Sequence, residues 1–386
     1  MDNTLIPPAK ARVSVPVIAL GMYAVASGYL MSLIPLILSH YNLDTAIASW
    51  LASSFYAGLL VGALSIEPLV TRIGYKHGFA LCLGVLLLTI VVMPLFATPA
   101  VWLLARLVAG VAVAGVFVVV ESWLLHGDEA DRAKRLGLYM GALYGGSSLG
   151  QLGIGAIGVG GMLPFAAIFT MLILAIGVLL FARSEQPEAS HSTPLSLKQI
   201  SKLNHAAIIG CIVSGLTLGA IYGLMPLELL NRGIAHDDLG RLMALIILGA
   251  MAVQPLIPAL SKYLGRTLLM ALFCLLGVAA ITLTAAVSGI YALGAGLFLL
   301  GMAIFALYPV AINLACDKLD ASFIVCATQV MLFSYSVGSV VGPLIADNFL
   351  VGPQGLMGYL FACLLATSIY MLIASVKTKG RAMAGE

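Results

Sequence analysis

Long apolar segments recur along the whole chain and are separated by short polar breaks. A helix needs about 20 apolar residues to cross the hydrocarbon core of a bilayer, whereas a strand of a membrane barrel is about half as long and alternates in polarity. The pattern therefore predicts twelve membrane-spanning helices, at residues 13–38, 46–70, 78–97, 101–125, 136–159, 162–182, 206–230, 239–260, 268–287, 290–314, 322–349 and 355–376.

The composition supports a protein that is embedded in a lipid bilayer. Of the 386 residues 61% are hydrophobic and 9% are charged, whereas about 25% are charged in soluble domains. We therefore expect an all-α membrane protein. The 19 lysines and arginines are scattered between the apolar runs, which argues against a nucleic-acid partner.

The distribution of these charges predicts the orientation. With twelve spans, the loops and helix ends on the side of the two termini hold sixteen lysines and arginines, whereas those on the other side hold two, Arg232 and Arg241. Cytoplasmic loops carry the excess of positive charge in membrane proteins. We therefore expect a multi-pass protein of the inner (cytoplasmic) membrane with both termini in the cytoplasm.

The longest polar interval follows the sixth span and divides the chain. We predict an N-terminal six-helix half at 1–184, a cytoplasmic linker at 185–205 and a C-terminal six-helix half at 206–386. The second part of the linker is either a short amphipathic helix at the membrane surface or an unstructured connector. Four pairs of identical residues are separated by 191 positions in the two halves: Pro35 and Pro226, Gly74 and Gly265, Gly110 and Gly301, Tyr144 and Tyr335. A parallel repeat of this kind is typical of secondary transporters.

Two short segments resemble motifs of the major facilitator superfamily. EPLVTRIGYK at 67–76 is similar to the loop motif G-x-L-x-D-R-x-G-R-K, although it has Glu for the first Gly and Thr for the Asp. The second copy, PALSKYLGR at 258–266, also lacks the Asp. RLVAG at 106–110 is similar to the R-x-x-x-G of the fourth span in that family.

Four further segments resemble the YcaD-like branch of this superfamily: VVVES at 118–122, YGLMPL at 222–227, YPVA at 308–311 and SYSVGSVVGP at 334–343. The resemblance extends over the whole chain. It implies a fold of two pseudo-symmetric six-helix bundles and transport by alternating access, but it implies no particular substrate.

Arg106 is the only lysine or arginine that lies deep inside a predicted span. A charge in the bilayer core costs at least about 2.5–3.5 kcal/mol, so such a residue is a functional candidate. On a helical wheel it shares one face with Gly110, Val113, Phe117 and Glu121, and we expect this face to point at a central cavity. Arg106 either binds an anionic substrate group or tunes a proton-carrying acid, or it is a structural arginine that is bound to carbonyls or a fixed carboxylate.

A cytoplasmic gate is predicted where acidic and basic residues meet near the cytoplasmic end. Glu121 lies 15 residues after Arg106, about 22 Å along the axis, and is close to the level of the basic loops. It is a gate residue, a proton carrier or a solvated residue at a helix end. The predicted gate comprises Glu67, Arg72, Gly74, Glu121, Arg132 and Arg135.

The predicted proton-carrying residues are Glu228, Asp347 and Glu121. Glu228 and Asp347 lie near the outer ends of their spans, so each is a proton site, a partner of Arg106 or a solvated acid. The predicted substrate-binding or coupling residues are Arg106, Tyr23, Phe117, Tyr144, Gln151, Tyr222, Gln254, Tyr308, Gln329 and Tyr335. Any one of the polar side chains among them can instead bond a neighbouring helix.

Glycines recur at intervals of four in the fifth span, at 137, 141 and 145 and at 146 and 150. This spacing favours close helix packing, with bending during transport as the alternative. The six cysteines form no CxxC pair and no cluster with histidine, so we expect no metal and no cofactor. No residue is predicted to be catalytic.

These observations together predict a secondary active transporter that acts as a monomer and moves a small anionic or neutral solute, with protons as the second partner. The alternative within the class is a proton-coupled antiporter for efflux of drugs or metabolites. An intramembrane enzyme or a receptor that does not transport is a remote alternative, because no catalytic constellation is visible.

Overall fold

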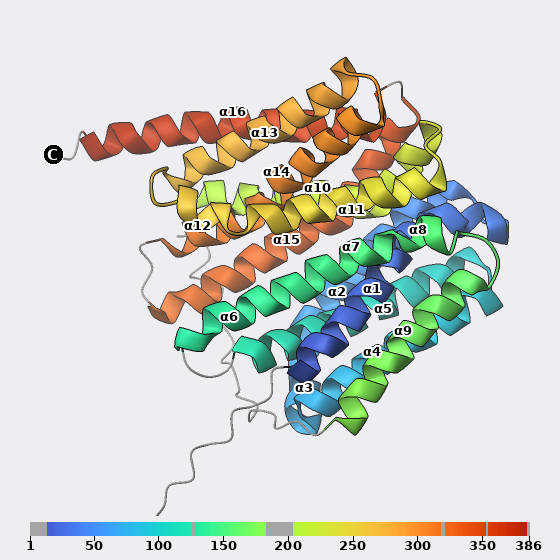
Figure 1. Cartoon of the computed structure of the whole chain (residues 1–386). Coiled ribbons are helices and arrows are strands. Elements are labelled where there is room, and N and C mark those ends of the chain that lie inside the picture. The colour runs from blue at the N-terminus through green and yellow to red at the C-terminus, as the bar shows by residue number, and fades with distance from the viewer. Residues whose placement is uncertain (1–13, 126–128, 183–203, 318–320, 353, 384–386) are drawn as a thin grey trace, which may run out of the picture.

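The computed structural model describes residues 14–125, 129–182, 204–317, 321–352 and 354–383. The predicted linker therefore lies almost entirely outside the described residues. Helices make up the described chain (Figure 1). Their bounds in the first bundle are α1 (Ser14–Ile37), η1 (Leu38–Tyr41), η2 (Thr45–Ile47), α2 (Ala48–Ser65), α3 (Glu67–Ile73), α4 (Tyr75–Leu95), α5 (Pro99–Leu125), α6 (Glu129–Met140), η3 (Gly141–Gly145), α7 (Gly146–Gln151), α8 (Gly153–Ala156) and α9 (Leu163–Phe181).

The second bundle consists of α10 (His205–Asn231), α11 (His236–Val253), α12 (Leu256–Leu260), α13 (Arg266–Ala286), α14 (Ile290–Cys316), α15 (Ala321–Leu350) and α16 (Gly355–Met383). The two bundles pair their helices in the same way. In the first, α1 packs on α7 and α9, and α5 packs on α2 and α4. In the second, α10 packs on α15 and α16, and α14 packs on α11 and α13. The pairing is that of two six-helix bundles related by pseudo-symmetry.

A matched pair of glycine contacts shows the same repeat at atomic detail. In the first bundle Gly58 of α2 and Gly110 of α5 pack so closely that a Cβ atom on either would overlap the backbone of the other helix. In the second bundle Gly249 and Gly301 make the equivalent contact between α11 and α14. Both pairs are related by the offset of 191 residues that the sequence predicts.

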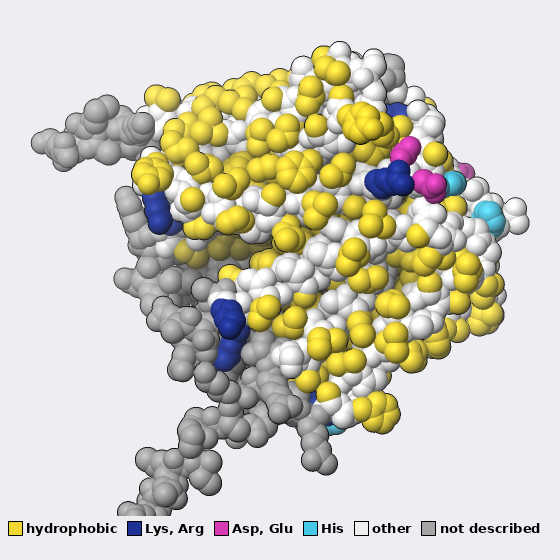
Figure 2. Space-filling view, viewed as in Figure 1, with side chains coloured by type: hydrophobic (Ala, Val, Ile, Leu, Met, Phe, Trp, Pro, Cys, Tyr) yellow, Lys and Arg dark blue, Asp and Glu magenta, His cyan; other side chains and the backbone are white. Residues whose placement is uncertain are grey.

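Ten helices in the described part of the chain are long and apolar enough to span a membrane. The two remaining spans of the twelve are the fifth and the eighth. The eighth, α11, carries Asp237, Asp238 and Arg241 near its start. Figure 2 shows a flank covered with apolar side chains, with charged residues gathered towards its two ends, as expected for a protein in a bilayer.

The fifth span differs from the single helix predicted at 136–159. It consists of α6, the π-helical segment η3, α7 and α8. A π-helical segment is a local widening of the helix, and such segments often mark bends and functional sites. The second span is also shorter than predicted, because α2 ends at Ser65 and a separate short helix, α3, follows it. A hydrophobicity pattern shows neither the π-helical segment nor the end of α2 at Ser65.

The two bundles touch each other mainly on one side. We call the side on which α1 and α10 begin the basic side, because its loops carry most of the lysines and arginines, and the other the opposite side. On the opposite half Ser53 donates a 2.7 Å hydrogen bond to the carbonyl oxygen of Val340, and Gly155 of α8 packs against Asp237 of α11. On the basic side, α6 packs on α1, α5 and η3, all in its own bundle.

Candidate functional site: a buried arginine between the two bundles

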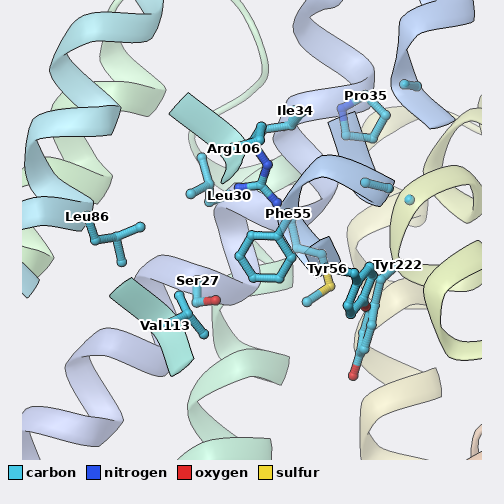
Figure 3. Close-up of a pocket in the computed structure, with 14 residues that line it drawn as sticks. Ser27, Leu30, Ile34, Pro35, Phe55, Tyr56, Leu86, Arg106, Val113 and Tyr222 are labelled. Atoms are coloured by element: carbon cyan, nitrogen blue, oxygen red, sulfur yellow. The ribbon is translucent and has the colours of Figure 1, made fainter. Parts of the chain in front are cut away.

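Arg106 is buried where the first bundle faces the second. It lies seven residues into α5, about 10 Å from the end of the helix on the opposite side, and 9% of its surface is exposed. Its guanidinium borders a cavity of about 50 Å³, shown in Figure 3. This is room for a few water molecules, and it is about a third of the volume of an engineered cavity of about 150 Å³ that binds benzene. The other polar side chains that line the cavity are Ser27, Tyr56 and Tyr222.

Arg106 has an aromatic neighbour in place of an acidic partner. Its guanidinium carbon lies 4.3 Å from the centroid of the Phe55 ring of α2, which is a cation–π contact. The Nε atom is buried and has no hydrogen-bond partner in the described structure. The ion pairs of the described residues are Arg232–Glu228, Arg241–Asp238 and Arg266–Asp317, so no described carboxylate neutralises Arg106.

The close packing of α5 on α2 explains this position and corrects part of one prediction, because Arg106 and Val113 of the predicted face border the cavity whereas Gly110 does not. The face of α5 that carries Arg106 and Gly110 was expected to point at a central cavity. Gly110 instead lies against α2, at the backbone of Phe55. The Arg106 side chain therefore lies between helices of the first bundle. It reaches the second bundle only through the small cavity, which Tyr222 of α10 also lines.

An aromatic cluster continues from this cavity between the bundles. The ring of Phe305 (α14) lies 5.9 Å from that of Tyr222 and 5.9 Å from that of Tyr144 in η3, both edge-on. Tyr308 and Tyr335 pack ring against ring at 4.9 Å in the second bundle. Tyr144 thus connects the π-helical segment of the first bundle to the second bundle. Four predicted residues are brought together here.

The remaining predicted aromatic pair lies within the first bundle. Tyr23 of α1 is buried, and its ring lies 6.4 Å from that of Phe117 in an edge-on arrangement. Tyr23 also interacts with the side chains of Ser27 and Arg106. The structure therefore places Tyr23 beside the cavity, with Phe117 one step further towards the basic side.

Glu121 lies on the basic half, near the second bundle. It is exposed and accepts a 3.0 Å hydrogen bond from the Tyr139 hydroxyl of α6. It is also close enough to Tyr308 of the second bundle to interact with it electrostatically. No described basic side chain forms an ion pair with Glu121. The predicted gate pairing is therefore not formed among the described residues in this conformation.

Glu228 occupies a different kind of site from the one proposed for a proton carrier. Its side chain is buried, Oε1 accepts a 2.8 Å hydrogen bond from Arg232 Nε, and Oε2 accepts a 3.0 Å bond from the backbone N–H of Leu356. Leu356 is in the first turn of α16, where a negative charge is favourable. Glu228 thus ties α10 to α16, and both of its oxygens are occupied.

Asp347 contacts the side chain of Ser49 on α2, across the two bundles on the opposite side. It is half-buried.

The predicted amide side chains lie elsewhere. Gln151 is fully buried and accepts a 2.5 Å hydrogen bond from Ser32 of α1. Gln254 donates a 3.2 Å bond to the carbonyl oxygen of Ala250, one turn earlier. Neither amide lies at the cavity of Arg106, and the side chain of Gln329 is outside the described residues.

The loop motif at 67–76 shapes the turn between α3 and α4 and connects α4 to the end of α9. Gly74 has φ = 81°, a conformation that residues with a side chain rarely adopt. Lys76 donates to the carbonyl oxygens of Leu180 and Ala182 at 3.3 and 3.1 Å, at the C-terminal end of α9, where a positive charge is favourable. Arg72 is exposed.

Of the three remaining residues of the predicted gate, the structure describes the side chain of one. The side chains of Glu67 and Arg132 lie outside the described residues. Arg135 is described and half-buried, and it has a partner. Among the described residues, no group of three or more histidine, cysteine or acidic side chains lies together as metal ligands do.

Sequence reasoning missed four residues of this region: Phe55, Tyr56, Tyr139 and Phe305. All four lie in apolar runs, where an aromatic residue carries no signal of its own. For Tyr56 and Tyr139 a hydroxyl within a predicted span was available as a signal. Phe55 and Phe305 could be found only once the helices were placed in space.

Comparisons with known proteins agree on one family. The sequence pattern of the Major Facilitator Superfamily matches residues 17–343. The uncharacterized MFS-type transporter YcaD of Salmonella paratyphi B is 32% identical over 366 residues, which cover 93% of this chain and 94% of that protein. An uncharacterized MFS-type transporter of Enterobacter sp. (strain 638) is 33% identical over 328 residues, which cover 83% and 84% of the two chains.

Two solved structures share the fold. The nucleoside transporter NupG aligns with a TM-score of 0.72 at 12% identity and covers 95% of this chain and 97% of its own. The POT family transporter PepTSo aligns with a TM-score of 0.74 at 10% identity and covers 96% and 98%. At these identities the likeness concerns the fold and carries no information on the substrate.

Proposed function

Because this chain belongs to the major facilitator superfamily, and is a transporter rather than an enzyme, we propose that it is a secondary transporter of small anionic solutes with Arg106 as the anion site. One observation carries the proposal. Arg106 is buried between helices of the first bundle, beside a small cavity that Tyr222 of the second bundle also lines; its Nε has no hydrogen-bond partner, and no described carboxylate pairs with it.

A buried charge without an anionic partner is destabilising, because a cation–π contact such as that with Phe55 offsets only part of the lost hydration. A substrate anion would supply the missing partner. The planar guanidinium, with its fixed fork of N–H donors, matches a carboxylate through two parallel hydrogen bonds. The structural alternative, an arginine bound to carbonyl oxygens or to a fixed acid, is not formed among the described residues.

Alternating access would follow from the way the bundles meet. The contacts of Ser53 with Val340 and of Asp347 with Ser49 lie on the opposite side, so this conformation would be open towards the basic side. The excess of lysines and arginines assigns the basic side to the cytoplasm. We therefore propose that the protein lies in the inner membrane with both termini in the cytoplasm.

The proposed organisation within the chain is an N-terminal half at 1–184, a cytoplasmic linker at 185–205 and a C-terminal half at 206–386. A monomer suffices for the proposed function, because both walls of the pathway come from one chain. No second chain is needed to complete the cavity of Arg106.

Proton coupling is the energy source that we propose, with Glu121 as the protonated residue. It is exposed, it accepts from Tyr139, and it approaches Tyr308 of the second bundle. A carboxylate in this position would change its surroundings whenever the bundles move. Glu228 is left out, because Arg232 and the start of α16 occupy both of its oxygens.

The test is uptake by purified protein in liposomes that contain a pH-sensitive dye. Pools of organic anions, sugars, amino acids and cationic dyes are added to wild type and to Arg106→Gln, with Arg241→Gln as the matched control. Arg241 is a useful control because its side chain is 70% exposed and it pairs with Asp238 at the surface.

We expect the anion pool to drive a proton flux that Arg106→Gln abolishes and Arg241→Gln retains. Movement of cationic dyes alone would replace the proposal with drug efflux. Normal anion transport by Arg106→Gln would show that Arg106 is structural.

A further inference from the structure

The surroundings of Arg106 carry information about the part of the substrate that is not charged. The cavity walls are apolar apart from Arg106, Ser27, Tyr56 and Tyr222. A sugar or another polyhydroxylated solute needs a hydrogen-bond partner for most of its hydroxyl groups when it is buried. Three hydroxyl groups and one guanidinium do not supply these partners.

The number of charges restricts the substrate further. Arg106 is the only lysine or arginine deep within a span. The other described arginines that form ion pairs, Arg232, Arg241 and Arg266, are at helix ends. One buried cation compensates one negative charge, and a second carboxylate on the substrate would be buried without a partner. This favours a monocarboxylate over a di- or tricarboxylate.

The size of the cavity determines where the uncharged part of the substrate can lie. A volume of about 50 Å³ is about a third of the roughly 150 Å³ of an engineered cavity that binds benzene, so the cavity admits a carboxylate group but is too small for an aromatic ring. The remainder of the substrate must therefore extend past Tyr222, which together with Gly223 forms the part of the cavity wall that belongs to the second bundle. Beyond Tyr222 lies the cluster with Phe305 and Tyr144.

This cluster is suited to an aromatic ring. The rings of Tyr222 and Tyr144 are each edge-on to that of Phe305, with centroids 5.9 Å apart and interplanar angles of 75° and 90°. Tyr222 and Tyr144 are half-buried, so parts of them are open to a ligand between the bundles. Aromatic pairs in offset or edge-on arrangements are more favourable than the buried area alone provides.

From this juxtaposition of Arg106 with the Tyr222–Phe305–Tyr144 cluster, we infer that the substrate is an aromatic monocarboxylate. Its carboxylate binds Arg106, and its ring packs in the aromatic cluster between the bundles. The inference rests on the proposed function, because it requires Arg106 to be an anion site.

The test compares binding of paired acids to the detergent-purified full chain by calorimetry. The pairs are benzoate with cyclohexanecarboxylate, phenylacetate with cyclohexylacetate, and 3-phenylpropionate with 3-cyclohexylpropionate. The saturated acids have the same charge and a similar shape, so each pair differs mainly in the contribution of aromatic contacts. We expect at least one aromatic acid to bind about two- to tenfold more tightly than its saturated partner.

Variants locate the preference. Phe305→Leu should weaken binding of the aromatic acids more than binding of their saturated partners, and so remove the aromatic preference. Phe169→Leu is the matched control, because Phe169 of α9 is an exposed aromatic residue of the first bundle, and it should keep the preference. Succinate should bind more weakly than each monocarboxylate.

The outcomes separate the two proposals. If aromatic and saturated acids bind equally and Arg106→Gln abolishes both, the anion site stands and the aromatic inference is overturned. The same holds if Phe305→Leu, still monodisperse, keeps the aromatic preference. If no acid binds in a manner that depends on Arg106, the proposed function itself fails.

Discussion

The hydroxyl of Tyr139 donates a hydrogen bond of 3.0 Å to the carboxylate of Glu121, and so connects the start of the broken fifth span to the end of α5. Both residues belong to the first bundle, yet Glu121 also approaches Tyr308 of the second bundle. The acid thus lies at the seam along which alternating access would open and close the protein. A substitution at Glu121 therefore tests proton coupling most directly.

Glu121→Gln should abolish uptake that is driven by a pH gradient and retain exchange of solute across the membrane without a gradient. The amide keeps an oxygen that can accept from Tyr139 but has no proton to release at these pH values. The measurement is uptake against exchange in the same liposomes.

Glu228→Gln is the control for this experiment. It should lower thermal stability, because it weakens the contact with Arg232 (2.8 Å, side chain of Glu228 6% exposed), and it should keep the coupling. Coupled uptake by Glu121→Gln, or its loss in Glu228→Gln at full stability, would move the proton site away from Glu121.

Arg106→Lys should bind the substrate anion about ten- to a hundredfold more weakly than wild type, because a charge-assisted hydrogen bond is worth about 1.5–3 kcal/mol and lysine lacks the two-pronged geometry. Calorimetry on purified protein measures the loss. Wild-type affinity in Arg106→Lys would mean that a point charge suffices, and the argument for a planar carboxylate would be lost.

How much of this arrangement the sequence predicts depends on the kind of signal. Arg106 was predictable because a charge in an apolar run is conspicuous and costly. The repeat was predictable because Gly110 and Gly301 keep their spacing, and the structure shows that both are required by close contacts. The ion pair of Glu228 is indicated in the sequence by Arg232, which lies four residues later and therefore on the same face of the helix.

Other features leave no trace in a hydrophobicity pattern. The π-helical segment at Gly141–Gly145 changes which backbone groups pair, although the side chains stay apolar. The cation–π contact of Phe55 depends on how α2 is rotated against α5. A phenylalanine within an apolar run has the same appearance whether it faces lipid or a guanidinium.

The glycines of the fifth span should fall into two classes when they are changed to alanine. A Cβ on Gly150 would overlap the backbone of Val25 in α1, whereas a Cβ on Gly145 would meet nothing within 4 Å. Gly150→Ala should therefore lower stability by about 1–3 kcal/mol. Gly145→Ala should leave stability unchanged or raise it by up to about 1 kcal/mol, but slow transport if η3 bends during the cycle.

Thermal unfolding and initial uptake rates of the two variants separate these effects. Gly137→Ala is the control, because Gly137 also has open space around it but lies in the regular helix α6. Equal transport rates in Gly145→Ala and Gly137→Ala would show that η3 is a static feature. A stable Gly150→Ala would show that α1 and α7 can move apart at little cost.

A disulfide across the opposite side should stop transport reversibly. A Cβ atom built on Gly155 of α8 lies 3.4 Å from the Cβ and 2.8 Å from the Cα of Asp237 on α11, so the two helices must part slightly to reach the range of about 3.5–4.5 Å between Cβ atoms found in disulfides. The double variant Gly155→Cys with Asp237→Cys should cross-link under mild oxidation after a small local shift. Because the bond would hold the bundles together where they already touch, oxidised protein should show only background uptake and should recover when a reductant is added.

The two single variants control for the five described native cysteines, which are free thiols, and should transport under both conditions. Undiminished uptake by fully cross-linked protein would show that the bundles need not part at α8 and α11, and would contradict alternating access by separation of the two bundles on this side.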